Sequence, residues 1–215
     1  LRDFVEEPPG THRERIARVL RYIRAGDTYQ ANLSRRWQAE FAAAPLVSDV
    51  YRRLRRSNPA PFAALISLAP GRAIVSSSPE RLVSLRGDTV SAYGLAGSAR
   101  RGATPEEDAR LGAALLASPK DRAEHEVVVR TIVEDLAGLA TAITAPAEPT
   151  LMKVRNVQHL FTPIGGRIVP GNSVLDLVER LHPTPAVGGR PSAAALEWIR
   201  ANERLDRGWY AGPVG

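Results

Sequence analysis

The apolar residues of this chain change their spacing in blocks, and the order of these blocks limits the fold more than any other feature. Residues 11–26 carry apolar side chains three and four apart and open with the capping-box pair Thr11 and Glu14, which predicts a helix. Residues 31–39 alternate between apolar and polar side chains, which predicts a strand. Short strands that come in groups, rather than singly between helices, favour antiparallel pairing. The sequence therefore predicts an α+β fold with antiparallel β-sheet.

The rest of the chain continues this grouping. Four short strands, the last two joined by Gly87 and Asp88, are predicted to form a β-meander. Ser48 is the predicted N-cap of the helix before them, and a proline-containing linker at 146–149 precedes two more strands. The predicted strands are 62–69, 72–76, 81–85, 89–93, 151–161 and 167–169, and the predicted helices are 48–56, 105–117, 121–139, 173–181 and 192–202.

The length and composition are those of one globular domain, which we expect to span residues 1–215. The chain has no cysteine, which excludes a disulfide framework, a cysteine-ligated metal and a cysteine nucleophile. No apolar run approaches the ~20 residues of a membrane span and no signal peptide is recognisable, so we expect a cytoplasmic protein without a membrane partner. Because the first residue is leucine, we expect an internal piece of a longer product.

The chain is basic, with 29 Lys and Arg against 23 Asp and Glu and a net charge of +6. Lys120 and Lys153 are the two lysines, so the other 27 basic residues are arginines. Basic chains bind nucleic acid, anionic lipid or anionic small molecules. Aromatic residues make up only 6% of the chain and are not interleaved with the arginines, so nucleic-acid binding is not expected.

Two local motifs are candidates for binding a ligand or metal. Asp121, Glu124 and His125 share one face of a predicted helix, and carboxylate oxygens suit Mg²⁺. The alternative is helix capping, because acidic residues in a first turn favour the helix dipole. Gly188 and Gly189 precede a helix, where exposed amides bind phosphate or carboxylate, and the alternative is a plain connection.

Two further candidates lie on predicted strands. The small residues Ala96, Gly97 and Ser98 follow a strand and would let a ligand approach the backbone, unless they are only its exit. His159 stands alone on another strand, where a structural role is the alternative to catalysis. Taken singly, each of these signals is weak.

Seven blocks of the sequence nevertheless occur in the order found in one family. The chain resembles the chorismate-binding enzymes, which include anthranilate synthase large subunits and aminodeoxychorismate, isochorismate and salicylate synthases. The blocks that carry the resemblance are AGDTYQANLSR (25–35), SSPERLV (77–83), YGLAGSARRG (93–102), KDRAEHEVVV (120–129), VQHLFTPIGGRI (157–168), HPTPAVGG (182–189) and ERLDRGWYAGPVG (203–215).

The resemblance implies two antiparallel β-sheets packed face to face with helices outside, and an active site that depends on Mg²⁺. It implies that Glu124, with Asp121, binds the metal, and that His159 acts as a general acid at the departing C4 hydroxyl of chorismate. It further implies that the domain continues beyond Gly215. The substrate-binding positions that it implies are Ala96, Gly97, Ser98, Ala186, Gly188, Gly189 and Tyr210.

Different motifs point to different reactions within the family. Isochorismate synthases resemble this chain in the 182–189 loop, but they place a lysine base at Gln30 and a glutamate acid at Tyr93. Aminodeoxychorismate synthases commonly place a nucleophilic lysine at Ala96. We therefore expect amination of chorismate at C2, as in anthranilate synthase, a lyase of aromatic amino acid biosynthesis. Aminodeoxychorismate synthesis, which is a transferase reaction of folate biosynthesis, is the second choice.

The alternatives are an isochorismate synthase, which adds water at C2, and a degenerate chorismate-binding fragment without catalysis. The absence of cysteine bears on the nitrogen source, because a thiol-dependent glutaminase cannot reside in this chain. An aminating enzyme of this sequence would take free ammonia, or receive it from a separate glutamine amidotransferase subunit.

Overall fold

The computed structural model describes residues 1–215, which divide into two compact units. The larger unit comprises residues 46–182, and the smaller unit is formed by residues 1–45 together with residues 183–215. The six helices include none with the length and apolarity needed to cross a membrane. The predicted class, α+β with antiparallel sheets, is confirmed.

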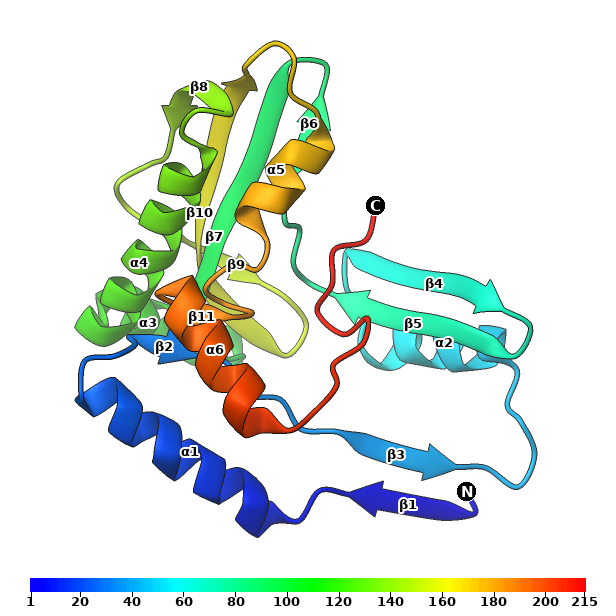
Figure 1. Ribbon diagram of the computed structural model, residues 1–215. Helices are drawn as coiled ribbons and strands as arrows, with labels where there is room; N and C mark the ends of the chain where they lie inside the picture. Colours follow the sequence, from blue (N-terminus) through cyan, green and yellow to red (C-terminus); the bar gives the residue numbers. More distant parts are fainter. The chain divides into compact units, whose positions relative to one another are not determined.

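The larger unit is built on a five-stranded antiparallel sheet in the order β6-β7-β10-β8, with β9 also paired to β10. Its long central pair, β7 and β10, is visible in Figure 1 as the green and yellow arrows that run side by side. The strands of this sheet are β6 (Ser84–Arg86), β7 (Thr89–Arg100), β8 (Ala140–Thr144), β9 (Thr150–Lys153) and β10 (Val157–Ile168).

Three helices pack with this sheet: α3 (Pro105–Ala117), α4 (Pro119–Leu136) and α5 (Val174–Leu181). Figure 1 shows α4 running along the β7–β10 pair. The approach is close, because a Cβ added at Gly94 would lie 2.5 Å from Cγ2 of Val129. The apolar core between sheet and helices consists of Val90, Ala92, Val128, Ile132, Leu136, Ala140, Ile164, Leu177 and Leu181.

Side-chain caps fix where these three helices begin. Thr104 and Ser118 accept hydrogen bonds from backbone N–H groups in the first turns of α3 and α4. Ser173 and Asp176 form a capping box at α5. The capping box predicted at Thr11 is wrong, because the first helix begins earlier with proline in its first turn and has no side-chain cap. Ser48 is likewise not a cap, since Leu46 holds that position.

The predicted β-meander is also wrong, because its strands belong to two separate hairpins. β4 (Phe62–Ala69) and β5 (Arg72–Ser78) pair only with each other and pack with α2 (Val47–Ser57). β6 and β7 form the second hairpin, which is part of the five-stranded sheet. Hydrophobic runs indicate where strands form, but they do not indicate which strands pair. The pairing of these four strands could therefore not be predicted from the sequence.

The smaller unit joins both ends of the described chain. Its small core contains Val19, Trp198 and Ile199 from two helices, with Tyr22 and Ile23 packed against them. The elements of this unit are β1 (Asp3–Glu6), α1 (Pro9–Arg24), β2 (Gln30–Ala31), β3 (Trp37–Glu40), β11 (Gly189–Arg190) and α6 (Ser192–Glu203). β1 pairs with β3 and β2 pairs with β11, both antiparallel.

The continuous strand predicted at 31–39 is interrupted, because other groups take its backbone hydrogen bonds. The N–H of Ser34 donates to the carboxylate of Glu203 at 2.9 Å, and Arg207 donates to the carbonyl of Asn32 at 2.8 Å. Arg207 also donates twice to Glu203, whose side chain is buried. This ion pair therefore replaces a neighbouring strand as the partner of residues 32–34.

A second buried carboxylate, Asp108 of α3, joins three parts of the larger unit. It accepts hydrogen bonds from Arg101 (2.7 and 3.0 Å), from Lys153 of β9 (2.7 Å) and from the N–H of Gly102 (3.0 Å). The hydrogen bonds from Arg101 and Lys153 hold the pKa of Asp108 well below its ordinary value of 3.8. Asp108 therefore stabilises the fold only while it is ionised.

This network predicts how stability depends on pH. The contribution of Asp108 is complete above the unfolded-state pKa of 3.8 and is lost as the pH falls further toward the lower folded-state pKa. We expect Asp108→Asn to lower the free energy of unfolding near neutral pH and to flatten its fall in acid, measured by urea unfolding at several pH values. Asp49→Asn, at an exposed carboxylate, is the control. An unchanged stability and acid slope for Asp108→Asn would contradict the prediction.

Candidate functional site

In the larger unit, the candidate residues of α4 lie beside an irregular point of β7. The pairing of β7 with β10 skips one residue there, so that His159 faces Ser98 while Leu160 faces Ala96. Gly97 is the extra residue of this β-bulge and has φ +74°. A Cβ added at Gly97 would lie 3.2 Å from the Cβ of Asp121, so the bulge brings the strand against the first turn of α4.

The two carboxylates of α4 differ in their surroundings. Asp121 accepts a hydrogen bond from the Ser118 hydroxyl, so it takes part in the capping of α4. Glu124 is half-buried and makes no hydrogen bond or ion pair with the rest of the chain. Residues 1–215 contain no group of three or more acidic or histidine side chains arranged to hold a metal ion. Asp121 and Glu124 thus offer two oxygen donors, a number that suits Mg²⁺, which keeps water or substrate oxygens as its other ligands.

The candidate histidine makes one side-chain hydrogen bond. Oγ of Ser98 and Nδ1 of His159 are 2.8 Å apart. Desolvation by burial lowers the pKa of His159 below its ordinary 6.5, against an opposing interaction with the Gly97 carbonyl. The imidazole is therefore neutral at pH 7.

His125, next to Glu124, has a different role from the one implied by its place in the motif. It is buried on the face of the sheet that α4 covers, and its Nε2 is 2.8 Å from Oγ1 of Thr162 on β10. Burial lowers its pKa too, and the positive charge of Arg122 acts in the same direction. His125 therefore joins α4 to β10 inside the core and is not available to a ligand.

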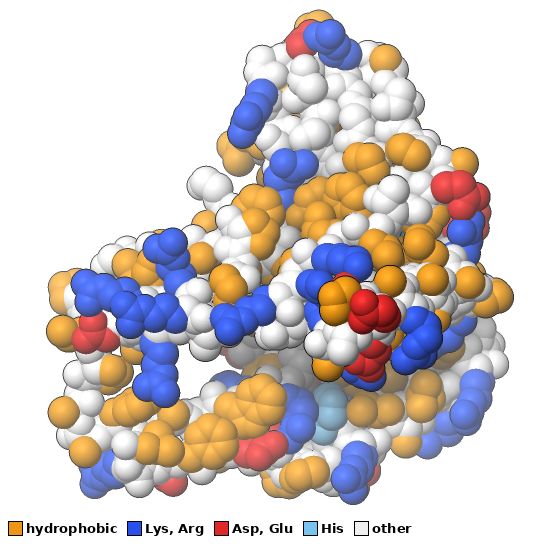
Figure 2. Space-filling view, turned by 180° about the vertical axis from the view of Figure 1, so that it is seen from behind, with side chains coloured by type: hydrophobic (Ala, Val, Ile, Leu, Met, Phe, Trp, Pro, Cys, Tyr) orange, Lys and Arg blue, Asp and Glu red, His pale blue; other side chains and the backbone are white.

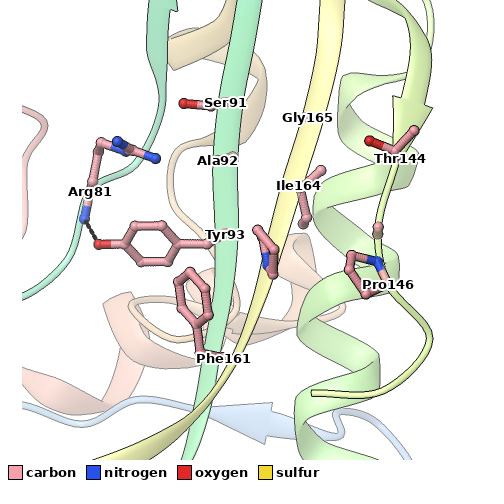
Figure 3. A pocket seen from close by; sticks show the side chains of 11 residues that line it. Arg81, Ser91, Ala92, Tyr93, Thr144, Pro146, Phe161, Ile164 and Gly165 are labelled. Carbon is pink, nitrogen blue, oxygen red and sulfur yellow. Dashed lines mark hydrogen bonds between the residues drawn. The ribbon is translucent and has the colours of Figure 1, made fainter. Parts of the chain in front are cut away.

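An open depression of about 510 Å³ lies over β7 and β10 in the larger unit. Figure 3 shows Tyr93 and Phe161 at its lower end and Arg81 beside them. The Tyr93 hydroxyl accepts a hydrogen bond from the N–H of Arg81 (2.7 Å) and donates to the carbonyl of Pro79 (3.1 Å). Side chains alternate along a strand, so Tyr93, Phe161 and His159 share the face of the sheet that points away from α4.

Arg81 is a pocket residue that the sequence motifs did not single out. Its guanidinium lies 5.3 Å from the centroid of the Tyr93 ring, and its Nε is buried without a hydrogen-bond partner. A cation in such a setting suits a carboxylate group. Its position in the SSPERLV block was the one feature of the sequence that could have identified Arg81, because its neighbouring residues do not distinguish it from the other arginines.

In the smaller unit, Gln30 lies against the glycine-containing loop. Gln30 pairs with Arg190 and Ala31 with Gly189, and the Thr28 hydroxyl donates to the carbonyl of Arg190 at 2.6 Å. The Oε1 atom of Gln30 is buried and accepts no hydrogen bond. The backbone of Gly189 lies so close to Gln30 that an added Cβ would be 2.1 Å from its carbonyl oxygen.

The other candidates of the smaller unit lie in the loop and near the end of the chain. The amide of Asn32 donates to the carbonyl of Ala186, and the N–H of Asn32 donates to Gly188 at 3.1 Å. The loop is thus held against residues 30–32. Tyr210 is 65% exposed, and its described interactions are those of its backbone turn with Arg207.

Each unit therefore gathers part of the predicted site. In the larger unit, Gly97 lies against Asp121 of α4, and Ser98 contacts His159 on the face of the sheet that points away from α4. Ala96 lies opposite Leu160, and Glu124 is one turn further along α4. The smaller unit brings together Gln30, Ala186, Gly188 and Gly189. The catalytic and binding roles of these residues stay predictions. Basic side chains are dispersed among apolar ones on the surface shown in Figure 2 and do not form one continuous band there.

Comparison with known proteins gives a consistent family. A family model described as chorismate binding enzyme matches residues 3–215. The chain is 48% identical over 141 residues to the salicylate biosynthesis isochorismate synthase of Pseudomonas aeruginosa, covering 66% of this chain and 30% of that protein. It is 38% identical over 205 residues to anthranilate synthase component 1 of Streptomyces coelicolor, covering 94% of this chain and 40% of that protein.

Solved structures agree with the sequence comparisons. The crystal structure of anthranilate synthase component I from Streptococcus pneumoniae matches with a TM-score of 0.88 and 30% identity, covering 99% of this chain and 47% of that one. The chain thus spans less than half the length of each of these three relatives. The residues matched by the family model, 3–215, include all the candidate residues of both units. The chain belongs to the chorismate-binding enzyme family.

Proposed function

We propose that this chain is the core of a Mg²⁺-dependent enzyme that aminates chorismate at C2, of the anthranilate synthase type or, second, of the aminodeoxychorismate synthase type. In the anthranilate synthase reaction, ammonia adds at C2 and the C4 hydroxyl leaves as water. Loss of pyruvate then gives the aromatic ring. Chorismate and ammonia are thus converted to anthranilate, pyruvate and water, with no oxidant or reductant required.

The observation that carries this proposal is the presence of an amide side chain, that of Gln30, at the position where isochorismate synthases place a lysine base. An amide takes up no proton near neutral pH, so Gln30 cannot activate water as a general base. Ammonia needs no such activation, because its neutral form is already a nucleophile. The buried Oε1 of Gln30 is an acceptor without a donor, and leaving such an atom unpaired costs about 1–3 kcal/mol.

The hydrogen bonds of Tyr93 support the same reading. Its hydroxyl both accepts from the N–H of Arg81 and donates to the carbonyl of Pro79, so its proton is already engaged. Desolvation by burial also raises the pKa of Tyr93 above its ordinary value of 10. Tyr93 is therefore a poor substitute for the carboxylic acid expected there in an isochorismate synthase.

The remaining residues have roles in binding and proton transfer. Glu124 and Asp121 would hold Mg²⁺, which would supply Lewis-acid chemistry at the ring carboxylate and the C4 hydroxyl of the substrate. His159 lies on the strand face shared with Tyr93, and its neutral ring would donate a hydrogen bond to the departing C4 oxygen. The amides of Gly188 and Gly189 would bind a substrate carboxylate, with Ala186 in the same loop and Ala96, Gly97, Ser98 and Tyr210 as further substrate contacts.

The nitrogen would reach this enzyme as ammonia, free in solution or released by a separate glutamine amidotransferase subunit. This follows from the absence of cysteine, because the chain cannot contain a thiol-dependent glutaminase. Ammonium salt is therefore sufficient as the nitrogen source in an assay.

Isochorismate synthesis is the alternative to amination, and the identity of 48% to an isochorismate synthase favours it. That similarity covers 66% of the chain. In this alternative, water adds at C2 and the C4 hydroxyl leaves, so the product contains no nitrogen. A different group from Gln30 would have to accept the proton of the attacking water.

One experiment separates these reactions. The protein is incubated with chorismate and Mg²⁺, with and without ¹⁵N-ammonium, in water enriched in ¹⁸O, and the products are identified by mass spectrometry. We expect ¹⁵N-labelled anthranilate and one equivalent of pyruvate, formed only with ammonium. Labelled aminodeoxychorismate would assign the second aminating reaction. ¹⁸O-labelled isochorismate, formed without ammonium, would overturn the proposal, and binding of chorismate without any product would identify a non-catalytic member.

A further inference from the structure

The β-bulge at Gly97 determines what His159 contacts. If the pairing of β7 with β10 stayed regular past Ala96, Gly97, which has no side chain, would lie opposite His159. With the bulge, Ser98 is the direct cross-strand neighbour of His159, and Met152 of β9 is the neighbour on the other side. A φ of +74° is readily adopted by glycine and strains other residues. The bulge is therefore a specific feature of the sequence that pairs a hydroxyl with an imidazole.

The two ring nitrogens of His159 have different surroundings. Nδ1 is 2.8 Å from the Ser98 hydroxyl, no hydrogen bond joins Nε2 to another side chain, and the Gly97 carbonyl is a further acceptor near the ring. Nε2 is thus the nitrogen that a ligand can reach. A neutral imidazole carries one proton, and the nitrogen that holds it decides whether Nε2 is a donor or an acceptor.

We propose that Ser98 is a positioning residue whose hydroxyl donates to Nδ1 of His159, so that the ring proton is held on the accessible Nε2. The inference rests on the proposed function in that His159 is taken to face the substrate. It assigns Ser98 to the histidine, whereas the family resemblance implied only a contact with substrate. His159 then acts through Nε2–H as a donor to the departing oxygen of the substrate, while Nδ1 is closed to other partners.

The lowered pKa of His159 is consistent with this arrangement, because a neutral ring can accept at Nδ1 whereas an imidazolium cannot. His125 supplies a comparison within the same molecule. It is paired to a hydroxyl through the opposite nitrogen, Nε2, by Thr162. The two histidines are therefore expected to give separate and distinguishable nitrogen signals.

The tautomer can be measured without any assay of activity. Two-bond ¹⁵N–¹H correlation spectra of the whole protein at about pH 8 report which ring nitrogen carries the proton. The chain has four histidines, and the signals of His159 are assigned by their loss in His159→Gln. We expect the Nε2–H form in the wild type and in Ser98→Thr, which keeps the hydroxyl. We expect a mixture of tautomers in Ser98→Ala.

An Nδ1–H form in the wild type, or an unchanged tautomer in Ser98→Ala, would overturn the proposal. Kinetics give a second, independent readout. We expect Ser98→Ala to lower kcat by about 10-fold with little change in KM, and Ser98→Thr to restore it. Ser84→Ala removes a hydroxyl of the neighbouring strand that makes no hydrogen bond, and it is the control for folding and rate.

The two readouts separate this inference from the proposed function. A raised KM with unchanged kcat in Ser98→Ala would mean that Ser98 binds substrate directly, and it would overturn the positioning role. If the wild type forms isochorismate instead of an aminated product, the proposed function fails while the tautomer measurement still decides the role of Ser98.

Discussion

Replacing Glu124 by glutamine is expected to reduce Mg²⁺-dependent turnover of chorismate by more than about 100-fold and to leave the fold intact. Glutamine has the shape of glutamate but no negative charge, so it is a far weaker ligand for Mg²⁺. Glu124 makes no hydrogen bond or ion pair with the chain, so its loss removes no described contact. The measurements are kcat as a function of Mg²⁺ concentration and the midpoint of thermal unfolding.

Glu126→Gln is the matched control, because Glu126 is an exposed glutamate two residues further along the same helix. It removes the same charge from α4 but should leave turnover within about 2-fold of the wild type, in line with the small effects of surface substitutions. A near-normal rate for Glu124→Gln would remove Glu124 from the metal site. Equal losses in both variants would show that the charge of α4 matters in general and that Glu124 has no special role.

Replacing Gly189 by alanine is expected to destabilise the smaller unit strongly. The new Cβ would lie 2.1 Å from the carbonyl oxygen of Gln30 and 2.7 Å from the Cβ of Ala195. Both contacts are far inside van der Waals distance, and neither partner is the end of a flexible side chain. Together with φ +136°, the clash should cost more than about 4 kcal/mol and separate β2 from β11.

Gly26→Ala tests whether backbone strain alone explains such a loss. Gly26 also has a positive φ, +87°, but nothing lies within 4 Å of an added Cβ. We expect this variant to lose only about 1 kcal/mol, the cost of the left-handed conformation for a residue with a Cβ. Thermal or urea unfolding of both variants gives the comparison. If Gly189→Ala proved no less stable than Gly26→Ala, the close approach of the loop to Gln30 would be refuted.

Local signals in the sequence located most elements of the larger unit. The helix predicted at 105–117 coincides with α3, and the apolar stripe of α4 forms part of the core as expected. Gly87 and Asp88 joined the predicted strands that became β6 and β7. In each case the signal and the structure involve residues close together in the chain. No strand was predicted at Ala140–Thr144, where β8 lies.

The sequence alone could not predict which residues from distant parts of the chain form hydrogen bonds with each other. Residues 32–34 alternate as a strand does, yet backbone groups of Asn32 and Ser34 are bonded to Glu203, Arg207 and Gly188. The Ser98–His159 pair depends on a register shift that only the paired strands reveal. The candidate residues were found because family motifs mark positions, whereas the geometry of each pair came from the structure.

The division of the chain into units also bears on how it folds during synthesis. The larger unit is one continuous segment, so all of its contacts can form once residue 182 has been made. The smaller unit must wait for the last part of the chain, since the hydrogen bond from Thr28 to Arg190 joins residues 162 positions apart. Closing so long a loop is slow compared with forming local contacts, although each doubling of loop length adds only about 0.6 kcal/mol. Once residues 46–182 have left the ribosome, the larger unit can therefore be folded while residues 1–45 still lack their partners from residues 183–215.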